Sequence, residues 1–274
     1  MPTVPSKQPS VPRQQSHQAR DVAESFGVDA ERYDRSRPRY PEAMVQSILA
    51  TSPGRDVLDV GIGTGIVARQ FRAAGCTILG VEPDPRMAEF ARRDGTEVEV
   101  STLETWDPAG RTFDIVVAGQ SWHWVDPVVG TAKAAEVLRP GGRLALFWNV
   151  GQPPPELVEA FAEVYRRLLP DSPVNQTLAT AAVQVYVAGG DKAADNIRET
   201  GAFGDPEQRQ FHWEQRYTRD EWLEFSATTG AATQLPRAVL DEVLADLGAA
   251  IDEMGGSFVA QYTAVMVTAA RLAT

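Results

Sequence analysis

The segment VLDVGIGTG, residues 57–65, constrains the fold more than any other part of this 274-residue chain. Its first four residues form a short apolar run, which is typical of a buried parallel strand. The three glycines that follow let the backbone turn tightly and approach a ligand closely. They open an expected helix, whose first N–H groups suit the polar or anionic end of a ligand. The segment therefore predicts a strand, a ligand-binding turn and a helix.

Strands and helices alternate after this turn, which favours right-handed βαβ crossovers and a parallel sheet. The expected strands cover residues 77–81, 98–100, 113–118 and 143–148, and the expected helices cover residues 66–74, 83–93 and 128–138. A strand over residues 258–268 follows a tight link, so we expect it to return antiparallel at the edge of the sheet. These patterns predict an α/β, Rossmann-like three-layer sandwich with a mostly parallel seven-stranded sheet and an antiparallel last strand.

The chain divides into a tail and one domain. Residues 1–20 contain four Pro, four Gln and no acidic residue, and they show no helical or strand period, which predicts a disordered tail. Residues 21–274 are expected to form the domain. Within it, residues 150–207 look like a helical insertion between the fifth and sixth strands, with a loop expected at Gly189-Gly190.

Charge and composition narrow the function classes. The net charge is −11, and because residues 1–40 carry +2, the remainder carries −13. A domain with this much negative charge repels the phosphate backbone of a nucleic acid. We therefore expect no nucleic-acid partner. The chain has one cysteine, no Cys/His cluster with zinc spacing and no apolar run of the ~20 residues that a membrane helix needs. We therefore expect a cytoplasmic protein with no metal and no membrane contact.

The side chain of Glu82 is a carboxylate at a position suited to binding a nucleoside. Glu82 follows the second expected strand, 21 residues after Gly61, where it can accept both hydroxyls of a ribose. Dinucleotide sites use G-x-G-x-x-G, but this chain has G-x-G-x-G and carries Ile66 at the third glycine position, which makes a poorer cradle for a pyrophosphate. The combination predicts a nucleoside-containing cofactor other than a dinucleotide.

With this pattern the chain resembles the class I S-adenosylmethionine-dependent methyltransferases, in which an acidic residue precedes G-x-G-x-G. Here the acidic residue is Asp59 and the glycines are Gly61, Gly63 and Gly65. Three later segments continue the resemblance: VEP at 81–83 as the ribose motif, TFDIV at 112–116 on the fourth strand, and LRPGG at 138–142 before the fifth. The likeness covers about residues 40–150.

A narrower resemblance lies upstream of these motifs. The pattern Tyr33-x-x-x-Arg37-Pro38-x-Tyr40-Pro41 is similar to the N-terminal segment of small-molecule methyltransferases of the trans-aconitate type, where it folds over the cofactor. The resemblance implies that Tyr33 and Arg37 contact the methionine carboxylate of S-adenosylmethionine. The alternative is that the segment is a proline-rich lead-in to a helix.

The resemblance also implies roles for other residues. Asp59 would order the glycine turn and the methionine amine, and Glu82 would hold the ribose. The remaining assignments are Pro83, Asp84 and Met87 on one side of the adenine, Thr102, Leu103 and Glu104 on the other, and Gln120 and Ser121 beside the methionine.

The catalytic candidate lies in the segment QSWHWVD, residues 120–126, just after the fourth strand. His123 is its best-placed titratable side chain, and a base is needed only if the acceptor is a hydroxyl that must lose its proton. The alternative is that His123 and Trp124 pack the start of the next helix and order the cofactor turn.

These observations predict an S-adenosylmethionine-dependent methyltransferase that acts on a small-molecule acceptor. O-, N- and C-methylation stay open, as does a homodimer. The alternatives are an NAD(P)-dependent oxidoreductase and a non-catalytic S-adenosylmethionine-binding protein. We expect residues 150–207 to shape the acceptor pocket, with Trp148 and Asn149 at its edge.

Overall fold

The computed structural model describes residues 26–170 and 182–273. The tail expected at residues 1–20 lies outside the described residues, and so do residues 171–181 of the expected insertion. Within the described part, no helix is long and apolar enough to cross a membrane.

A seven-stranded sheet forms the centre of the structure, with the strand order β3-β2-β1-β4-β5-β7-β6. Neighbouring strands from β3 to β5 are parallel, whereas β7 is antiparallel to both β5 and β6. The predicted sheet is therefore confirmed. The strands are β1 (Asp56–Val60), β2 (Thr77–Glu82), β3 (Glu97–Val100), β4 (Phe113–Gly119), β5 (Leu138–Gln152), β6 (Glu207–Thr218) and β7 (Ser257–Ala270).

The last strand does not lie at the edge of the sheet, which corrects one expectation. β7 pairs with β5 on one side and with β6 on the other, so that Val267 lies between Leu146 and Gln208. The run from Ala264 to Val267 is at most 1% exposed, because helices cover both faces of the sheet there. β6 takes the edge position instead, and most of its alternate side chains, such as that of His212, are exposed.

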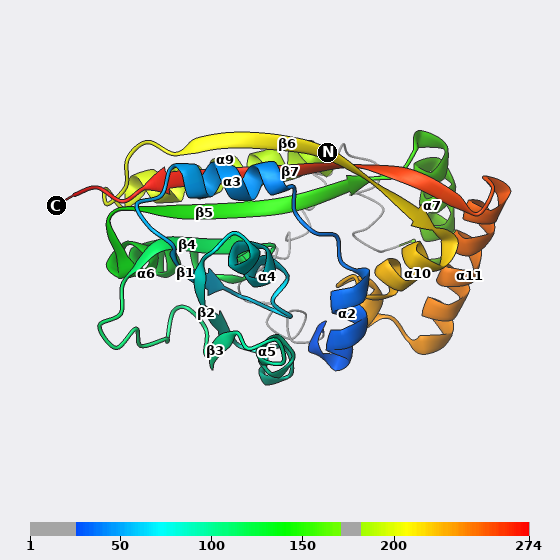
Figure 1. Ribbon diagram of the computed structural model, residues 1–274. Coiled ribbons are helices and arrows are strands. Elements are labelled where there is room, and N and C mark those ends of the chain that lie inside the picture. The colour runs from blue at the N-terminus through cyan, green and yellow to red at the C-terminus, as the bar shows by residue number, and fades with distance from the viewer. Residues whose placement is uncertain (1–25, 171–181, 274) are drawn as a thin grey trace, which may run out of the picture.

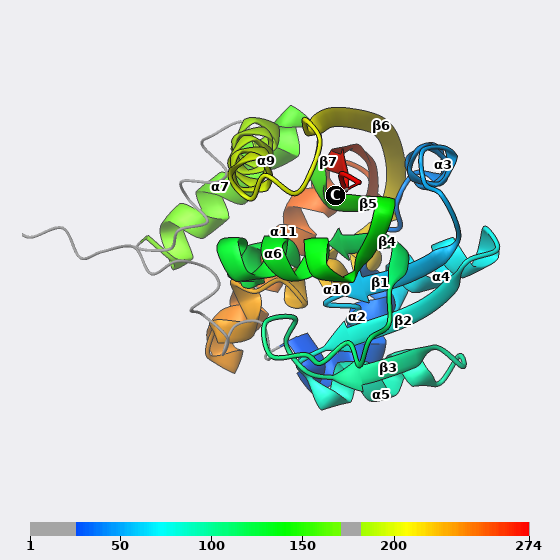
Figure 2. The same ribbon diagram turned by 90° about the vertical axis from the view of Figure 1, so that its left-hand side faces the viewer.

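Helices cover both faces of this sheet and complete the predicted three layers (Figure 2). On one face, α3 (Glu42–Ala50), α4 (Ile66–Ala73) and α5 (Pro85–Arg92) bury their apolar side chains against the strands. On the other face, α6 (Pro127–Val137) and α9 (Ala182–Glu199) do the same. Figure 2 shows α6 and α9 on the opposite side of the sheet from α3 and α4.

A second group of helices, here called the cap, lies beyond the carboxyl end of β5 (Figure 1). Leu157, Phe161, Trp222 and Leu247 of these helices pack with the ends of β6 and β7 in a core of their own. Burying each such side chain stabilises the cap by about 1.5–3 kcal/mol. The cap contains α7 (Pro155–Leu168), α10 (Arg219–Ala227), the short helix η4 (Ala232–Gln234) and α11 (Arg237–Glu253).

The loop expected at Gly189-Gly190 is wrong, because α9 continues through both glycines. A Cβ atom on Gly190 would lie 3.2 Å from Cγ2 of Val267 and 3.0 Å from Nε2 of Gln208. The glycine therefore allows the helix to approach the sheet closely, which outweighs its cost of about 1 kcal/mol in a helix interior.

Candidate functional site

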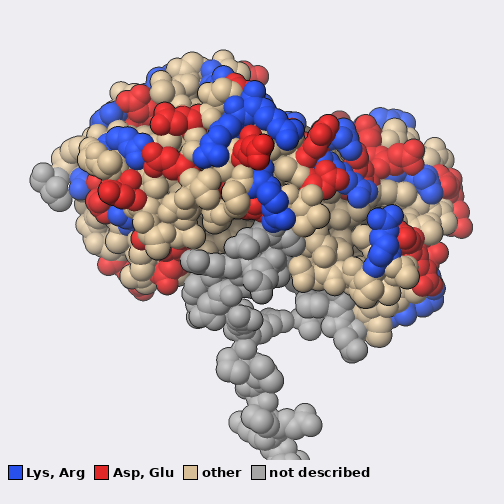
Figure 3. Space-filling view, turned by 90° about the horizontal axis from the view of Figure 1, so that it is seen from below, with Lys and Arg blue, Asp and Glu red and all other residues tan. Residues whose placement is uncertain are grey.

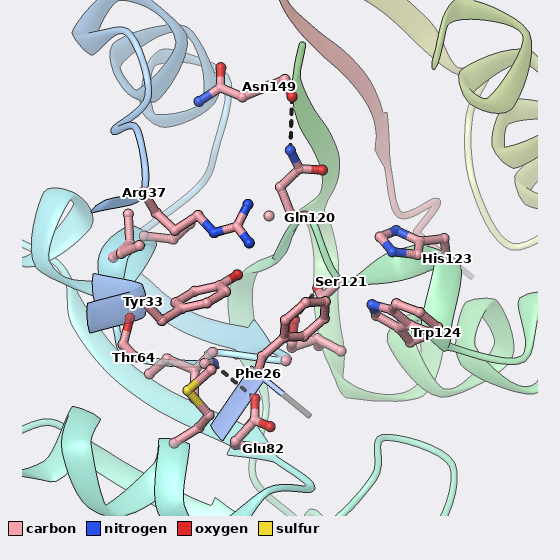
Figure 4. Close-up of a pocket in the computed structure, with 18 of the residues that line it drawn as sticks. Phe26, Tyr33, Arg37, Thr64, Glu82, Gln120, Ser121, His123, Trp124 and Asn149 are labelled. Atoms are coloured by element: carbon pink, nitrogen blue, oxygen red, sulfur yellow. Dashed lines mark hydrogen bonds between the residues drawn. The ribbon is translucent and has the colours of Figure 1, made fainter. Parts of the chain in front are cut away.

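A cavity of about 520 Å³ lies between the carboxyl ends of the strands and the cap. The residues that line it come from the segment before β1, the loops after β1, β2, β3 and β4, the end of β5, and α9, the cap and β7. Figure 4 shows part of this lining. A topological switch point occurs where β1 has β2 and β4 on either side, and open α/β sheets bind ligands there.

The glycine turn has the backbone geometry that the motif requires. The φ angles of Gly61, Gly63 and Gly65 are +65°, +56° and +85°, a region that other residues rarely adopt. A Cβ atom on Gly61 would lie 2.5 Å from Cβ of Ser121, whereas a Cβ atom on Gly63 would meet nothing within 4 Å. Gly63 also lines the cavity, so this backbone is accessible to a ligand.

Glu82 ends β2 and faces the turn. Its Oε2 accepts the N–H of Gly63 at 2.8 Å, and its Oε1 accepts the N–H of Asp84 at 3.0 Å. Only 7% of the residue is exposed, and burial raises the pKa of Glu82 to about 7 despite both hydrogen bonds. The side chain lines the cavity, so its carboxylate can also accept hydroxyl donors from a ligand.

Asp59 lies behind the glycine turn and does not line the cavity. The residue is 1% exposed, and its Oδ2 has no hydrogen-bond partner among the described residues. Burial, together with the nearby charge of Glu82, raises the pKa of Asp59 to about 8. An unpaired buried carboxylate is unfavourable without a ligand, and a cationic ligand next to the turn would relieve it.

The loop after β4 forms the centre of the site. Ser121 donates its hydroxyl to the carbonyl of Val60 at 2.5 Å, which ties this loop to β1. Gln120 has a φ of +57°, a strained value for a residue other than glycine. Its Nε2 donates to the carbonyl of Asn149 at 2.8 Å, and Nδ2 of Asn149 donates to the carbonyl of Arg39 at 2.9 Å. These bonds hold the side chains of Gln120 and Asn149 at the cavity wall.

The segment of residues 26–41, which precedes α3 and is here called the strap, covers one side of the cavity. It contains the short helix η2 (Phe26–Asp29) and α2 (Ala30–Ser36). The side chains of Tyr33 and Arg37 line the cavity, and Nη2 of Arg37 donates to the carbonyl of Thr228 at 2.5 Å. Arg35 of the strap forms an ion pair with Glu224 of α10. The strap is therefore fastened to the cap.

His123 belongs to the short helix η3 (Trp122–Trp124), and its ring is accessible from the cavity. The residue is exposed to this cavity, but the protein atoms around it desolvate the ring and lower the pKa of His123 to about 4. It is therefore neutral at pH 7. A base with so low a pKa takes up a proton poorly, but a neutral imidazole can still donate or accept a hydrogen bond.

Most residues that the sequence predicts for the site share this cavity. Those in its lining are Tyr33, Arg37, Gly61, Gly63, Glu82, Pro83, Met87, Thr102, Leu103, Glu104, Gln120, Ser121 and His123. Asp59, Gly65 and Asp84 do not line it. Gly65 precedes α4, and the carboxylate of Asp84 accepts the N–H of Arg86 at the start of α5.

Several lining residues escaped the sequence prediction because they come from parts of the chain with no motif. They are Phe26, Tyr186, Phe225, Thr229, Gly230 and Tyr262.

Comparison with known proteins decides the family of this site. Residues 58–146 match the family described as a methyltransferase domain. Residues 58–146 therefore form a methyltransferase domain. The matched residues of this domain include the glycine turn, Glu82 and the loop after β4. The resemblance that rests on Asp59 and the three glycines is thereby confirmed.

Relatives support the same conclusion over different lengths of chain. An uncharacterized methyltransferase of Mycobacterium tuberculosis is 38% identical over 132 residues, which cover 47% of this chain and 54% of the relative. A malonyl-[acyl-carrier protein] O-methyltransferase of Hahella chejuensis is 27% identical over 203 residues, covering 67% of this chain and 73% of the relative. The match thus spans about half the length of the mycobacterial relative.

A solved structure extends the likeness in fold. It comes from Anaeromyxobacter dehalogenans, is proposed to be a type II methyltransferase, and superimposes with a TM-score of 0.64 at 24% identity. The superposition covers 87% of this chain and 99% of that chain. In the part of this chain that the structure describes, no cluster of His, Cys, Asp and Glu is arranged to hold a metal ion.

Proposed function

We propose that this protein transfers a methyl group from S-adenosylmethionine to a small-molecule acceptor. The observation that carries the proposal is one continuous cavity with two unlike ends. The glycine turn and Glu82 form one end, and aromatic side chains of the strap, the cap and β7 form the other. When bound, S-adenosylmethionine supplies an electrophilic methyl group on a positively charged sulfur.

The charges at the turn favour this cofactor over a dinucleotide. The described lining residues include two carboxylates, Glu82 and Glu104, but only one guanidinium, that of Arg37. Burial raises the pKa values of Asp59 and Glu82, as expected for carboxylates that a cationic ligand would stabilise in their charged form. A doubly negative pyrophosphate would be repelled at this place.

The first half of the cavity has the groups that a nucleoside needs. Glu82 would accept the ribose hydroxyls, the exposed backbone of Gly63 would approach the methionine part, and Asp59 would order the turn from behind. Pro83, Met87 and Leu103 would enclose the adenine with apolar surface. Gln120 and Ser121, held by their hydrogen bonds to Asn149 and Val60, would mark the boundary with the acceptor half.

The acceptor half would be built by the cap and by residues 150–207. Tyr186 comes from that segment, and Phe225, Thr229 and Gly230 come from α10 and the loop that follows it. We propose that His123 contacts the acceptor as a neutral hydrogen-bonding group. The strap would exclude water by covering both halves, which methyl transfer requires.

A small acceptor fits the cavity better than a macromolecule does. Its volume of about 520 Å³ lies in the range typical of small-molecule sites. On the face seen in Figure 3, basic side chains are interspersed with acidic ones and do not form a continuous basic surface that would suit a nucleic acid.

Two measurements test the proposal. Isothermal titration should detect binding of S-adenosylhomocysteine and no binding of NAD; binding of NAD alone would overturn it in favour of an oxidoreductase. Methyl-labelled S-adenosylmethionine, incubated with the protein and fractionated metabolites, should pass its label to a small molecule. Binding without any transfer would instead favour a non-catalytic S-adenosylmethionine-binding protein.

A further inference from the structure

Arg37 is the one Lys or Arg among the described residues that line the cavity, and its charge is incompletely paired. Its Nη2 donates to the carbonyl of Thr228, but its Nε is buried with no hydrogen-bond partner. None of the ion pairs formed in the described part of the chain includes it. A cation in such a place is costly unless an anion approaches it, so a ligand is the natural source of that anion.

Two aromatic rings lie close to Arg37 inside the cavity. Its guanidinium carbon lies 4.5 Å from the ring centre of Tyr33 and 5.2 Å from that of Phe225. In Figure 4 the guanidinium points towards Gln120 and away from Glu82. The resemblance of the strap implies that Arg37 contacts the methionine carboxylate of the cofactor. The anion that pairs with Arg37 could therefore belong either to the cofactor or to the acceptor.

Electrostatics supports the acceptor side. Burial raises the pKa values of four tyrosines, and in each case the positive charge of Arg37 acts against that rise; they are Tyr40, Tyr186, Tyr217 and Tyr262. Arg37 is not among the charges that shift the pKa values of Asp59 and Glu82. The charge of Arg37 therefore acts on Tyr186 and Tyr262, which line the same cavity.

Two of these tyrosines can donate to the same anion. Tyr186 and Tyr262 both line the cavity. The hydroxyl of Tyr262 lies 2.7 Å from that of Tyr217, and burial keeps both phenols protonated. One hydrogen bond between two hydroxyls uses one proton. When Tyr217 is the donor, the proton of Tyr262 is free for a ligand.

We infer that the acceptor carries a carboxylate, which Arg37 binds through its charge and which Tyr186 and Tyr262 bind through their hydroxyls. The inference rests on the proposed function, since the cofactor must fill the other half of the cavity. Arg37 and a sulfonium would together repel an acceptor amine in its ammonium form, so the same arrangement selects against cationic acceptors.

The test separates the two halves of the cavity with three variants. Affinities are measured for S-adenosylhomocysteine, for its decarboxylated analogue, and for the probes benzoate and benzamide with S-adenosylhomocysteine saturating. Arg37→Gln should weaken benzoate at least about tenfold while changing the affinity for S-adenosylhomocysteine less than about threefold. Arg37→Lys should retain part of the benzoate affinity, and Tyr262→Phe should weaken benzoate several-fold.

Arg32→Gln is the matched control, because Arg32 belongs to the same strap but does not line the cavity. It should leave every affinity unchanged. The inference is overturned if wild-type protein binds benzoate no better than benzamide. It is also overturned if Arg37→Gln weakens S-adenosylhomocysteine as strongly as removal of the ligand carboxylate does. Failure of the wild-type protein to bind S-adenosylhomocysteine would instead overturn the proposed function.

Discussion

The carboxylate of Glu82 accepts the backbone N–H of Gly63 at 2.8 Å, which joins the end of β2 to the turn after β1. Two parts of the sequence motif that are 19 positions apart are thus in direct contact. Because Gly63 faces the cavity and Glu82 lines it, the contact holds both groups in position for one ligand.

Three glycine substitutions should separate strain from binding. Gly63→Ala and Gly75→Ala both place a side chain at positive φ with no neighbour within 4 Å, so each should destabilise the protein by about 1–2 kcal/mol. Of these two glycines only Gly63 lines the cavity, so Gly63→Ala should weaken the binding of S-adenosylhomocysteine by tenfold or more, whereas Gly75→Ala should not. Gly61→Ala should destabilise more, because its Cβ would lie 2.5 Å from that of Ser121.

Urea denaturation and isothermal titration would check these three variants. Equal affinities of Gly63→Ala and Gly75→Ala for S-adenosylhomocysteine would show that the turn does not contact the cofactor.

Asp59→Asn should change how stability depends on pH. The folded-state pKa of Asp59 is about 8, well above its usual value near 4. Below about pH 4 the group is protonated in both states. As pH rises from about 4 to 8 the unfolded chain ionises first, so stability is progressively lost. The Asn side chain resembles the protonated, neutral form of Asp59, so the substitution should remove this loss of stability.

The measurement is the free energy of unfolding of both proteins, without cofactor, at pH 5, 6, 7 and 8. The advantage of Asp59→Asn over the wild-type protein should grow with pH and level off near pH 8. A constant difference would mean that Asp59 is already ionised in the folded protein. The same variant should bind S-adenosylmethionine more weakly.

Gly27→Ala should loosen the strap. A Cβ atom there would lie 1.9 Å from Oδ2 of Asp84, whose carboxylate is held by hydrogen bonds from the N–H and guanidinium of Arg86. Either those bonds or the position of η2 must change. We expect faster hydrogen exchange in residues 26–37 and several-fold weaker binding of S-adenosylhomocysteine, with a small change in Tm. Val28→Ala, at a position 75% exposed, is the control and should resemble the wild-type protein.

His123 should stay neutral throughout the physiological range. Its pKa is lowered to about 4 by burial, so its ring should titrate in NMR spectra about two units below a free histidine. The unfolded chain binds this proton near pH 6.5, so the wild-type protein should lose stability as pH falls from about 6.5 to 4. His123→Gln should reduce this loss and also assign the NMR signal. If the ring instead titrates near pH 6.5, the prediction is wrong and His123 could act as a general base.

Local sequence was sufficient for the cofactor end of the cavity. The strand, the glycines and Glu82 lie within 26 consecutive residues, and their geometry follows from the positive φ angles of the turn and the register of β1 on β2. The parallel sheet followed from the alternation of helices and strands. Two predictions were wrong where local patterns were ambiguous: the run from Ala264 to Val267 in β7 is buried on both faces, and Gly190 lies inside α9, where it allows close packing on β7.

The opposite end of the cavity was decided by tertiary structure alone. Arg37 meets Thr228 across 191 positions of sequence, and Tyr262 arrives from a strand whose place in the sheet the sequence did not reveal. Hydrogen bonds and dihedral preferences within a short turn depend on neighbouring residues, so a local sequence motif can predict them. Contacts between the strap, the cap and β7 depend on how apolar surfaces from distant parts of the chain pack together. No local sequence pattern in this chain predicts that packing.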